Sequence, residues 1–174
     1  MTYVQHKDLP LVCSNYTLRP LSINYNSFYC SIYCDSELMR FVGAPLGLSE
    51  ARNSFQVALK LTHAKPSKQF YFVLENAQQR SCGLVGARWF NRQQRQVEVG
   101  IILLKQYHRK GIAKHAVVAI CNYAFCYFKV DTIVGRIQPD NTSALNLFKQ
   151  LGFRCEKQSD IHQLKIKNYN ERGV

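Results

Sequence analysis

VEVGIILLKQYHRKGIA, residues 97–113, carries the strongest structural signal in this chain of 174 residues. Its first part, 97–104, is mostly apolar and predicts a strand, and a short basic turn follows it. Residues 111–128 are apolar on nearly every side, with their polar members in the first turns, a pattern typical of a buried helix. We therefore expect a strand that runs through the turn directly into a helix.

The turn has the properties of an anion-binding site. The first turn of a helix leaves backbone N–H groups unpaired, and the helix dipole adds partial positive charge there. Gly111 lets a ligand approach the backbone closely. Full positive charge is added by Arg109, Lys110 and Lys114. These features suit a pyrophosphate, although an ordinary strand-to-helix turn with solvated basic side chains is the alternative.

The flanking sequence predicts an α/β domain with a mixed sheet. Short polar turns separate the stretches expected to form strands, which are 16–21, 69–75, 82–90, 131–138 and a closing hairpin of 153–157 with 161–167. Helices are expected at 26–42, 49–64 and 141–151. Ser22 or Asn24 would cap the first helix, and Gly152 would end the last. A strand–helix–strand unit inside an otherwise antiparallel sheet makes that sheet mixed.

Two motifs give this order of elements a family resemblance. His108-Arg-Lys-Gly-Ile-Ala113 resembles the Q/R-x-x-G-x-G/A motif of the GNAT superfamily of acetyl-CoA-dependent N-acetyltransferases. Residues 141–153 (NTSALNLFKQLGF) resemble that family's N-x-x-(A/S)-x-x-(L)-(Y/F)-x-x-x-G-F segment. The resemblance covers roughly residues 16–167. It is closest to the subgroup that contains ribosomal-protein-alanine acetyltransferases, polyamine acetyltransferases and some antibiotic acetyltransferases.

The resemblance implies a fold and a domain organisation. The fold would be α/β, with a mixed, mostly antiparallel sheet of about seven strands flanked by about four helices. The chain would comprise an N-terminal extension at 1–15, an N-acetyltransferase domain at 16–168 and a C-terminal tail at 169–174.

The resemblance also implies acetyl-CoA as co-substrate. Backbone N–H groups of 109–113 would surround its pyrophosphate, and its pantetheine arm would lie between diverging strands at 97–104 and 131–138. His108 stands where the family usually has Gln or Arg, and Asn141 could cap its helix, contact the cofactor, or do both. The implied cofactor-binding residues are Ile101, Ile102, Leu103, His108, Arg109, Lys110, Gly111, Ile112, Ala113, Asn141 and Phe148.

Catalysis requires a proton acceptor, because only a neutral amine can attack the thioester. Glu98 is the candidate, since it lies between apolar residues beside the expected acetyl site and matches a Glu of the subgroup; a solvated strand glutamate is the alternative. Phe148 replaces the Tyr that protonates the leaving thiolate in many members, and Ala144 replaces a frequent Ser. Ser143, Tyr107 or water could serve, so the general acid is unassigned.

The expected function is acetyl transfer to a primary amine by direct attack in a ternary complex. The amine would belong to a peptide N-terminus, an amino acid or a small molecule. A polyamine is less expected, because the segment 22–66 that selects the acceptor contains few acids, namely Asp35, Glu37 and Glu50. Because Phe148 has no proton to give, a GNAT fold that binds CoA without transferring is the alternative.

Composition limits the partners and the compartment. The 23 Lys+Arg and 11 Asp+Glu give a net charge of +12, which attracts polyanions. This charge makes a nucleic-acid-binding protein an alternative. It is a weaker one, because the densest basic stretch coincides with the turn expected to bind CoA. Seven cysteines without CxxC spacing predict no metal site and a reducing cytosol. The sequence shows neither a signal-peptide pattern nor an apolar run long enough to span a membrane. Edge strands and the C-terminal hairpin could support a homodimer.

Overall fold

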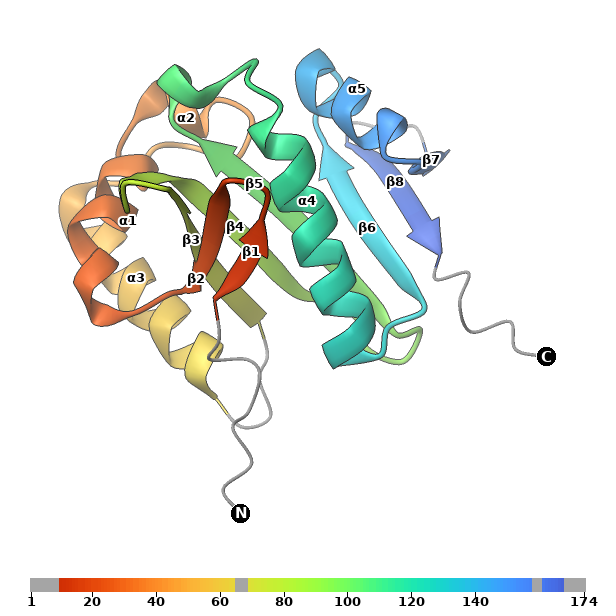
Figure 1. The fold of residues 1–174 in the computed structure, drawn as a ribbon, viewed down its shortest axis with the longest axis horizontal. Helices are drawn as coiled ribbons and strands as arrows, with labels where there is room; N and C mark the ends of the chain where they lie inside the picture. The colour runs from red at the N-terminus through yellow and green to blue at the C-terminus, as the bar shows by residue number, and fades with distance from the viewer. Residues whose placement is uncertain (1–9, 65–68, 158–160, 168–174) are drawn as a thin grey trace.

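A single mixed sheet organises the computed structural model, which describes residues 10–64, 69–157 and 161–167 (Figure 1). In the described residues the strand order is β1-β2-β3-β4-β5-β6-β8-β7. The strands are β1 (Leu11–Cys13), β2 (Tyr16–Pro20), β3 (Gln69–Asn76), β4 (Ser81–Asn91), β5 (Gln96–Leu103), β6 (Thr132–Ile137), β7 (Arg154–Lys157) and β8 (His162–Lys167). The α-helices are α1 (Asn26–Tyr33), α2 (Ser36–Met39), α3 (Leu48–His63), α4 (Ile112–Tyr123) and α5 (Thr142–Gln150).

This architecture confirms the expected α/β class, with eight strands rather than about seven and five helices rather than about four among the described residues. The additional strand is β1, which pairs antiparallel with β2 and lies within the segment 1–15 expected to precede the domain. The C-terminal tail at 169–174 lies outside the described residues. The closing hairpin forms as expected, because β7 pairs antiparallel with β8.

Side chains that alternate along the strands separate two faces of the sheet. Phe70, Phe72 and Leu74 of β3 share a buried cluster with α4 and α5, whereas Tyr71 and Val73 share another with α1 and α3. Figure 1 shows α4 crossing in front of the sheet, with α5 at its upper end. The molecule therefore has three layers, and the sheet separates the α4 and α5 face from the α1 and α3 face.

The only parallel pair in the described sheet breaks open after three residue pairs. Strands β5 and β6 are in register from Gln96–Thr132 to Glu98–Val134, but β5 continues to Leu103 and β6 to Ile137. Figure 1 shows the two strands diverging toward the top of the view. The divergence expected from the family resemblance is therefore present, and it begins at Glu98.

Two of the expected helices differ in detail. The helix expected at 26–42 is wrong as a continuous element, because Asp35 begins a second helix by accepting hydrogen bonds from the N–H groups of Glu37 and Leu38 at 2.8 and 2.9 Å. A 3-10 turn at Ile23–Tyr25 precedes α1, and Ser22 makes no side-chain cap. The helix expected at 111–128 is α-helical to Tyr123 and continues as a π-helical turn at Ala124–Phe128.

Candidate active site

The turn before α4 has the backbone conformation of an anion-binding loop. Arg109 and Gly111 have φ angles of +57° and +73°, with Lys110 between them. Left-handed residues in such a turn direct successive backbone N–H groups to one side, and the N-terminus of α4 adds its own unpaired amides. A Cβ at Gly111 would meet no heavy atom within 4 Å, so the space beside this backbone is open. Arg109 and Lys110 are exposed around it, whereas Ile112 is buried in the core.

Two side-chain contacts hold the turn in place. The ring Nε2 of His108 lies 2.9 Å from the carbonyl oxygen of Leu103, and since a carbonyl can only accept, Nε2 carries the proton and donates it. Lys105 forms an ion pair of 2.8 Å with Glu37 of α2. The imidazole that replaces the family's usual Gln or Arg therefore ties the turn to the end of β5.

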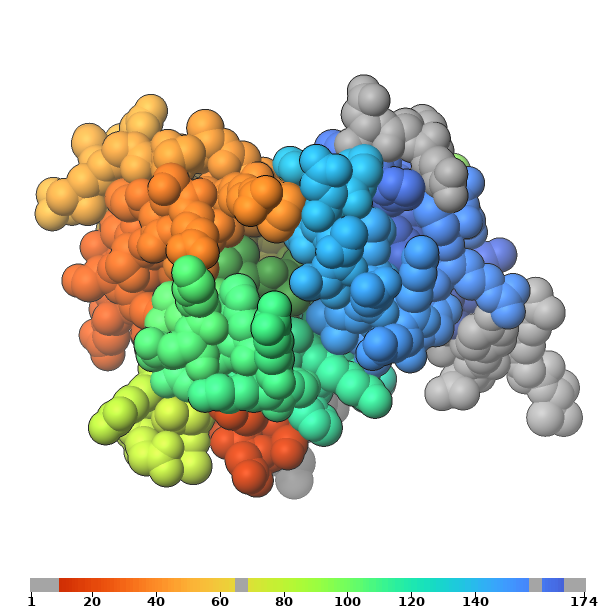
Figure 2. All heavy atoms as spheres, turned by 90° about the horizontal axis from the view of Figure 1, so that it is seen from above, coloured from red at the N-terminus to blue at the C-terminus, as the bar shows by residue number. Residues whose placement is uncertain are grey.

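A cavity of about 460 Å³ opens where β5 and β6 diverge. Figure 2 looks into this hollow between the orange atoms around α2 and the blue atoms of α5, with green strand atoms on its floor. Its lining residues are Tyr33, Phe41, Val42, Tyr71, Leu84, Gly86, Ala87, Arg88, Glu98, Val99, Gly100, Ile101, Ile102, Arg136, Ile137, Gln138, Asn141, Ala144, Phe148 and Ile161.

The cavity has walls from both faces of the sheet. Val99 and Ile101 belong to the cluster beneath α4, whereas Ile102 packs with the cluster of α1 and α3, so successive residues of β5 line it from opposite faces. Phe148 of α5 lines the first side, and Tyr33 of α1 lines the second. The opening between β5 and β6 thus connects the two faces, which gives two reactants separate approaches to one point.

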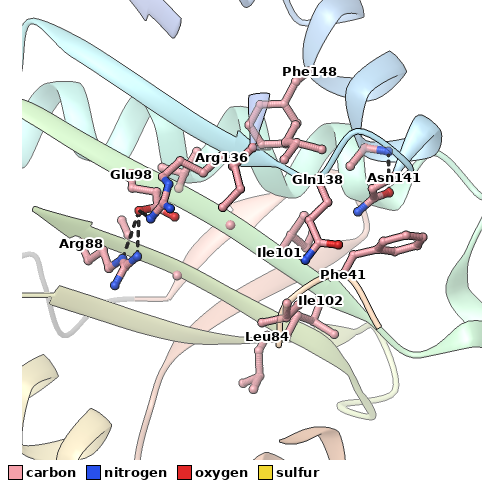
Figure 3. A pocket seen from close by; sticks show the side chains of 18 of the residues that line it. Phe41, Leu84, Arg88, Glu98, Ile101, Ile102, Arg136, Gln138, Asn141 and Phe148 are labelled. Atoms are coloured by element: carbon pink, nitrogen blue, oxygen red, sulfur yellow. Dashed lines mark hydrogen bonds and ion pairs between the residues drawn. The ribbon is translucent and has the colours of Figure 1, made fainter. Parts of the chain in front are cut away.

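Glu98 lies at the start of this opening and is paired with two arginines (Figure 3). Its Oε2 lies 2.9 Å from Arg88 Nη2, 3.2 Å from Arg88 Nε and 4.0 Å from Arg136 Nη1. Only 17% of the Glu98 side chain is exposed, so it is not a freely solvated strand residue. All three of these contacts engage Oε2 rather than Oε1.

The α5 end of the cavity is apolar where many family members carry Tyr. Phe148 is 3% exposed and packs at 4.7 Å between ring centroids against Phe153. It also fills the space beside Gly135, where a Cβ would lie 2.5 Å from the Phe148 ring. Neither Ser143, which is exposed on α5, nor Tyr107 is among the described residues that line the cavity.

Asn141 has the capping role that the sequence allowed. Its side-chain oxygen accepts a hydrogen bond of 3.2 Å from the N–H of Ala144 and so begins α5. The same residue lines the cavity, which leaves its amide nitrogen available to a ligand.

The structure places the expected site residues in two groups. Those in the cavity wall are Glu98, Ile101, Ile102, Asn141 and Phe148. Those on the turn or at its approach are Leu103, His108, Arg109, Lys110, Gly111, Ile112 and Ala113. The sequence pointed neither to Arg88 and Arg136 nor to the aromatic wall as parts of the site. The β4–β5 register pairs Arg88 directly with Glu98, so a hairpin alignment could have found that contact.

Across residues 10–64, 69–157 and 161–167, no group of three or more His, Cys, Asp or Glu side chains is arranged to hold a metal ion. Within the same described ranges, no helix combines the length and apolarity that a membrane crossing needs.

Known proteins share this sequence pattern and fold. The acetyltransferase (GNAT) domain family matches residues 15–154. An uncharacterized N-acetyltransferase p20 of Bacillus licheniformis is 22% identical over 142 residues, which are 80% of this chain and 79% of that protein.

Two solved structures show the same fold. Spermidine N-acetyltransferase from Vibrio cholerae, in complex with CoA and spermine, has a TM-score of 0.79 at 23% identity, covering 88% of this chain and 96% of its own. Ribosomal-protein-S5-alanine acetyltransferase from Vibrio fischeri has a TM-score of 0.81 at 17% identity, covering 95% and 100%. Because the matched family spans the diverging strands, the turn and the whole of α5, this chain belongs to the GNAT acetyltransferases, enzymes that use acetyl-CoA as co-substrate.

Proposed function

We propose that this enzyme transfers the acetyl group to a primary amine by direct attack, with both substrates bound at once. The observation that carries the proposal is the cavity that passes between β5 and β6. An anion-binding turn lies on one side of the sheet and a paired carboxylate on the other, so cofactor and acceptor can meet without exchanging places.

The residues present fit acetyl-CoA. The open space beside Gly111 would admit its pyrophosphate, with the exposed Arg109 and Lys110 as counter-charges. Since alternate backbone amides of a strand face the same neighbour, those of β5 beyond Glu98 face the gap rather than a paired strand. They would bind the pantetheine arm and stabilise the oxyanion that develops on the thioester carbonyl.

Glu98 is the proposed proton acceptor. As the amine nitrogen bonds to the thioester carbon, its proton passes to Glu98 Oε1, directly or through one water. The carbon–sulfur bond then breaks and the thiolate leaves. Among the described lining residues, α5 and its N-cap contribute Asn141, Ala144 and Phe148, and none of these side chains is an acid, so water protonates the thiolate in this scheme.

A CoA-binding protein that does not transfer is the second candidate, because Phe148 and Ala144 leave the thiolate without an acid. Release of free thiol from acetyl-CoA in the presence of a panel of amines distinguishes the two. The cytosolic location and the homodimer stay predictions, which fractionation and light scattering would test.

Gly111→Val tests the cofactor site. Valine at a φ of +73° is strained by roughly 1–3 kcal/mol, so we expect the turn to rearrange and the Kd for CoA to rise about tenfold or more by calorimetry. Gly152→Val is the matched control, because Gly152 has a φ of +86° at the end of α5. The Gly152→Val variant should lose about as much stability as Gly111→Val but keep the CoA affinity of the wild type. Unchanged affinity in Gly111→Val would remove the turn from the cofactor site.

A further inference from the structure

The charged residues of the cavity form one cluster. Among the described lining residues, the formally charged ones are Arg88, Glu98 and Arg136, and they sit together on the strand floor (Figure 3). Two guanidinium groups against one carboxylate leave this end of the cavity with a net charge of +1. A guanidinium has five N–H donors, so Arg88, which gives Glu98 only Nε and Nη2, retains donors for a second anion.

The acids that could bind a polycation are engaged elsewhere. Asp35 caps α2, Glu37 pairs with Lys105 at 2.8 Å, and Glu50 accepts the N–H of Gly47 at 2.8 Å. None of the three lines the cavity as described. A polyamine carries several positive charges and would meet a site that is already net positive, so it is a poor electrostatic match.

Next to the charged cluster the cavity is aromatic and hollow. Gly86 and Gly100 lie opposite each other on β4 and β5, one pleat along from Arg88 and Glu98. A Cβ at Gly100 would meet nothing within 4 Å, whereas one at Gly86 would lie 3.1 Å from the Tyr71 ring. Tyr33 stands beside Tyr71 in the wall, and burial raises the pKa of its phenol, which therefore stays neutral.

We propose that the acceptor is a free α-amino acid with an apolar side chain. The inference rests on the proposed function and specifies its acceptor. The amino group would lie at Glu98 Oε1, while the carboxylate would be held by Arg88 and Arg136. In an α-amino acid, a single carbon separates the amino group from the carboxylate. This short separation matches the site, in which Glu98 and the guanidinium groups of Arg88 and Arg136 are already in contact. The side chain would lie in the hollow over Gly86 and Gly100, beside Tyr71.

Matched substrates test this assignment. Phenylalanine, leucine, methionine and alanine would each be compared with the corresponding amino-acid amide, which keeps the amine and side chain but lacks the carboxylate. Thiol release is measured across pH, so that kcat/KM is expressed per neutral amine. We expect each acid to exceed its amide by roughly 10- to 100-fold, the value of one charge-assisted interaction. Spermidine should be poorer than phenylalanine.

Arginine variants show whether the selectivity comes from the cluster. Arg88→Gln and Arg136→Gln should lower kcat/KM for the acids by roughly 10- to 100-fold more than for the amides, because both substrates share the loss of a Glu98 partner and only the acids lose their own ion pair. The acid-to-amide ratio should therefore approach one, with the Kd for CoA little changed. Arg88→Lys should restore part of it. Arg154→Gln, on the exposed β7 strand, is the control and should behave as wild type. Circular dichroism verifies that each variant folds.

The outcomes separate this inference from the proposed function. If amides or spermidine are acetylated as well as the acids, and the arginine variants do not change the ratio, the acceptor assignment is overturned while acetyl transfer stands. If no amine is acetylated, binding of phenylalanine to the protein–CoA complex decides whether the amino-acid site exists. Arg88-dependent binding upholds the amino-acid site and refutes transfer, whereas absence of binding overturns the amino-acid site as well.

Discussion

At the scale of single residues, the role proposed for Glu98 makes the sharpest prediction. Glu98→Gln keeps the size of the side chain and an oxygen for Arg88, but it cannot take a proton. We expect kcat to fall about 10²- to 10⁴-fold, the usual contribution of general base catalysis, with the Kd for CoA unchanged. Steady-state kinetics and calorimetry measure the two quantities.

The control for this variant is another paired glutamate. Glu156 forms an ion pair of 2.8 Å with Lys165 in the C-terminal hairpin, away from the cavity. Glu156→Gln should keep full activity. A Glu98→Gln enzyme with wild-type kcat would show that water or another group takes the proton.

Phe148 gives a prediction in the opposite direction. Phe148→Tyr would place a phenolic donor on the cavity wall at the position where many family members carry one. If departure of the thiolate limits the rate, we expect kcat to rise about tenfold, a modest share of what a general acid can supply. Phe153→Tyr adds the same hydroxyl to the ring that packs against Phe148 and should not raise kcat. No gain in Phe148→Tyr would mean that protonation by water is already sufficient.

At the scale of elements, α2 determines where the wall of the cavity stands. Asp35 begins this short helix through two backbone hydrogen bonds, and the chain leaving it carries Phe41 and Val42 to the cavity. Asp35→Ala should lower the free energy of unfolding by about 1 kcal/mol and raise KM for the acceptor more than KM for acetyl-CoA. Urea unfolding and kinetics measure these effects.

Asp35→Ser supplies the comparison, because serine also caps helices. It should recover most of the stability and of the acceptor KM. If Asp35→Ala raised KM equally for the acceptor and for acetyl-CoA, α2 would not act through the wall of the acceptor site.

The elements also show what the sequence could and could not reveal. The strand, turn and helix of 97–128 were predictable because their signals are local: apolar period, glycine and basic residues. The break at Asp35 was missed although Asp is a favoured N-cap, because Tyr29, Ile32 and Met39 keep a helical spacing across it. Strand β1 was missed because three residues become a strand only by pairing with β2. Local patterns cannot supply such pairings.

The same distinction applies to the site. Glu98 stands out from the apolar residues around it, so its sequence context was enough to select it. Arg136 reaches it only because β5 and β6 run parallel and in register up to Glu98–Val134, a pairing between strands that α4 separates in the chain. Tyr33 and Phe41 flank α2, whereas Tyr71 lies in β3, and all three resemble ordinary core residues in sequence.

At the scale of the whole molecule, burial of thiols couples folding to alkaline pH. Burial raises the pKa of Cys121 to about 12 and that of Cys13 to about 11, whereas an unfolded cysteine titrates near about 8.5. Below about pH 8 both states keep these protons, and the thiols add no pH dependence. Above about pH 8.5 the unfolded chain releases protons that the folded chain retains, so the free energy of unfolding falls as pH rises, by up to about 1.4 kcal/mol per pH unit for each thiol.

Variants isolate this effect from every other titrating group. Urea unfolding of the wild type and of Cys121→Ala at pH 7.5, 8.5 and 9.5 should give two curves whose difference changes with pH by up to about 1 kcal/mol over the alkaline step. The constant part of the difference reports the cost of removing the buried sulfur, and the changing part reports the thiol proton. Cys126 is exposed, so Cys126→Ala should leave the slope unchanged. Parallel curves for Cys121→Ala and wild type would show that the Cys121 thiol is not protected from ionisation by the fold.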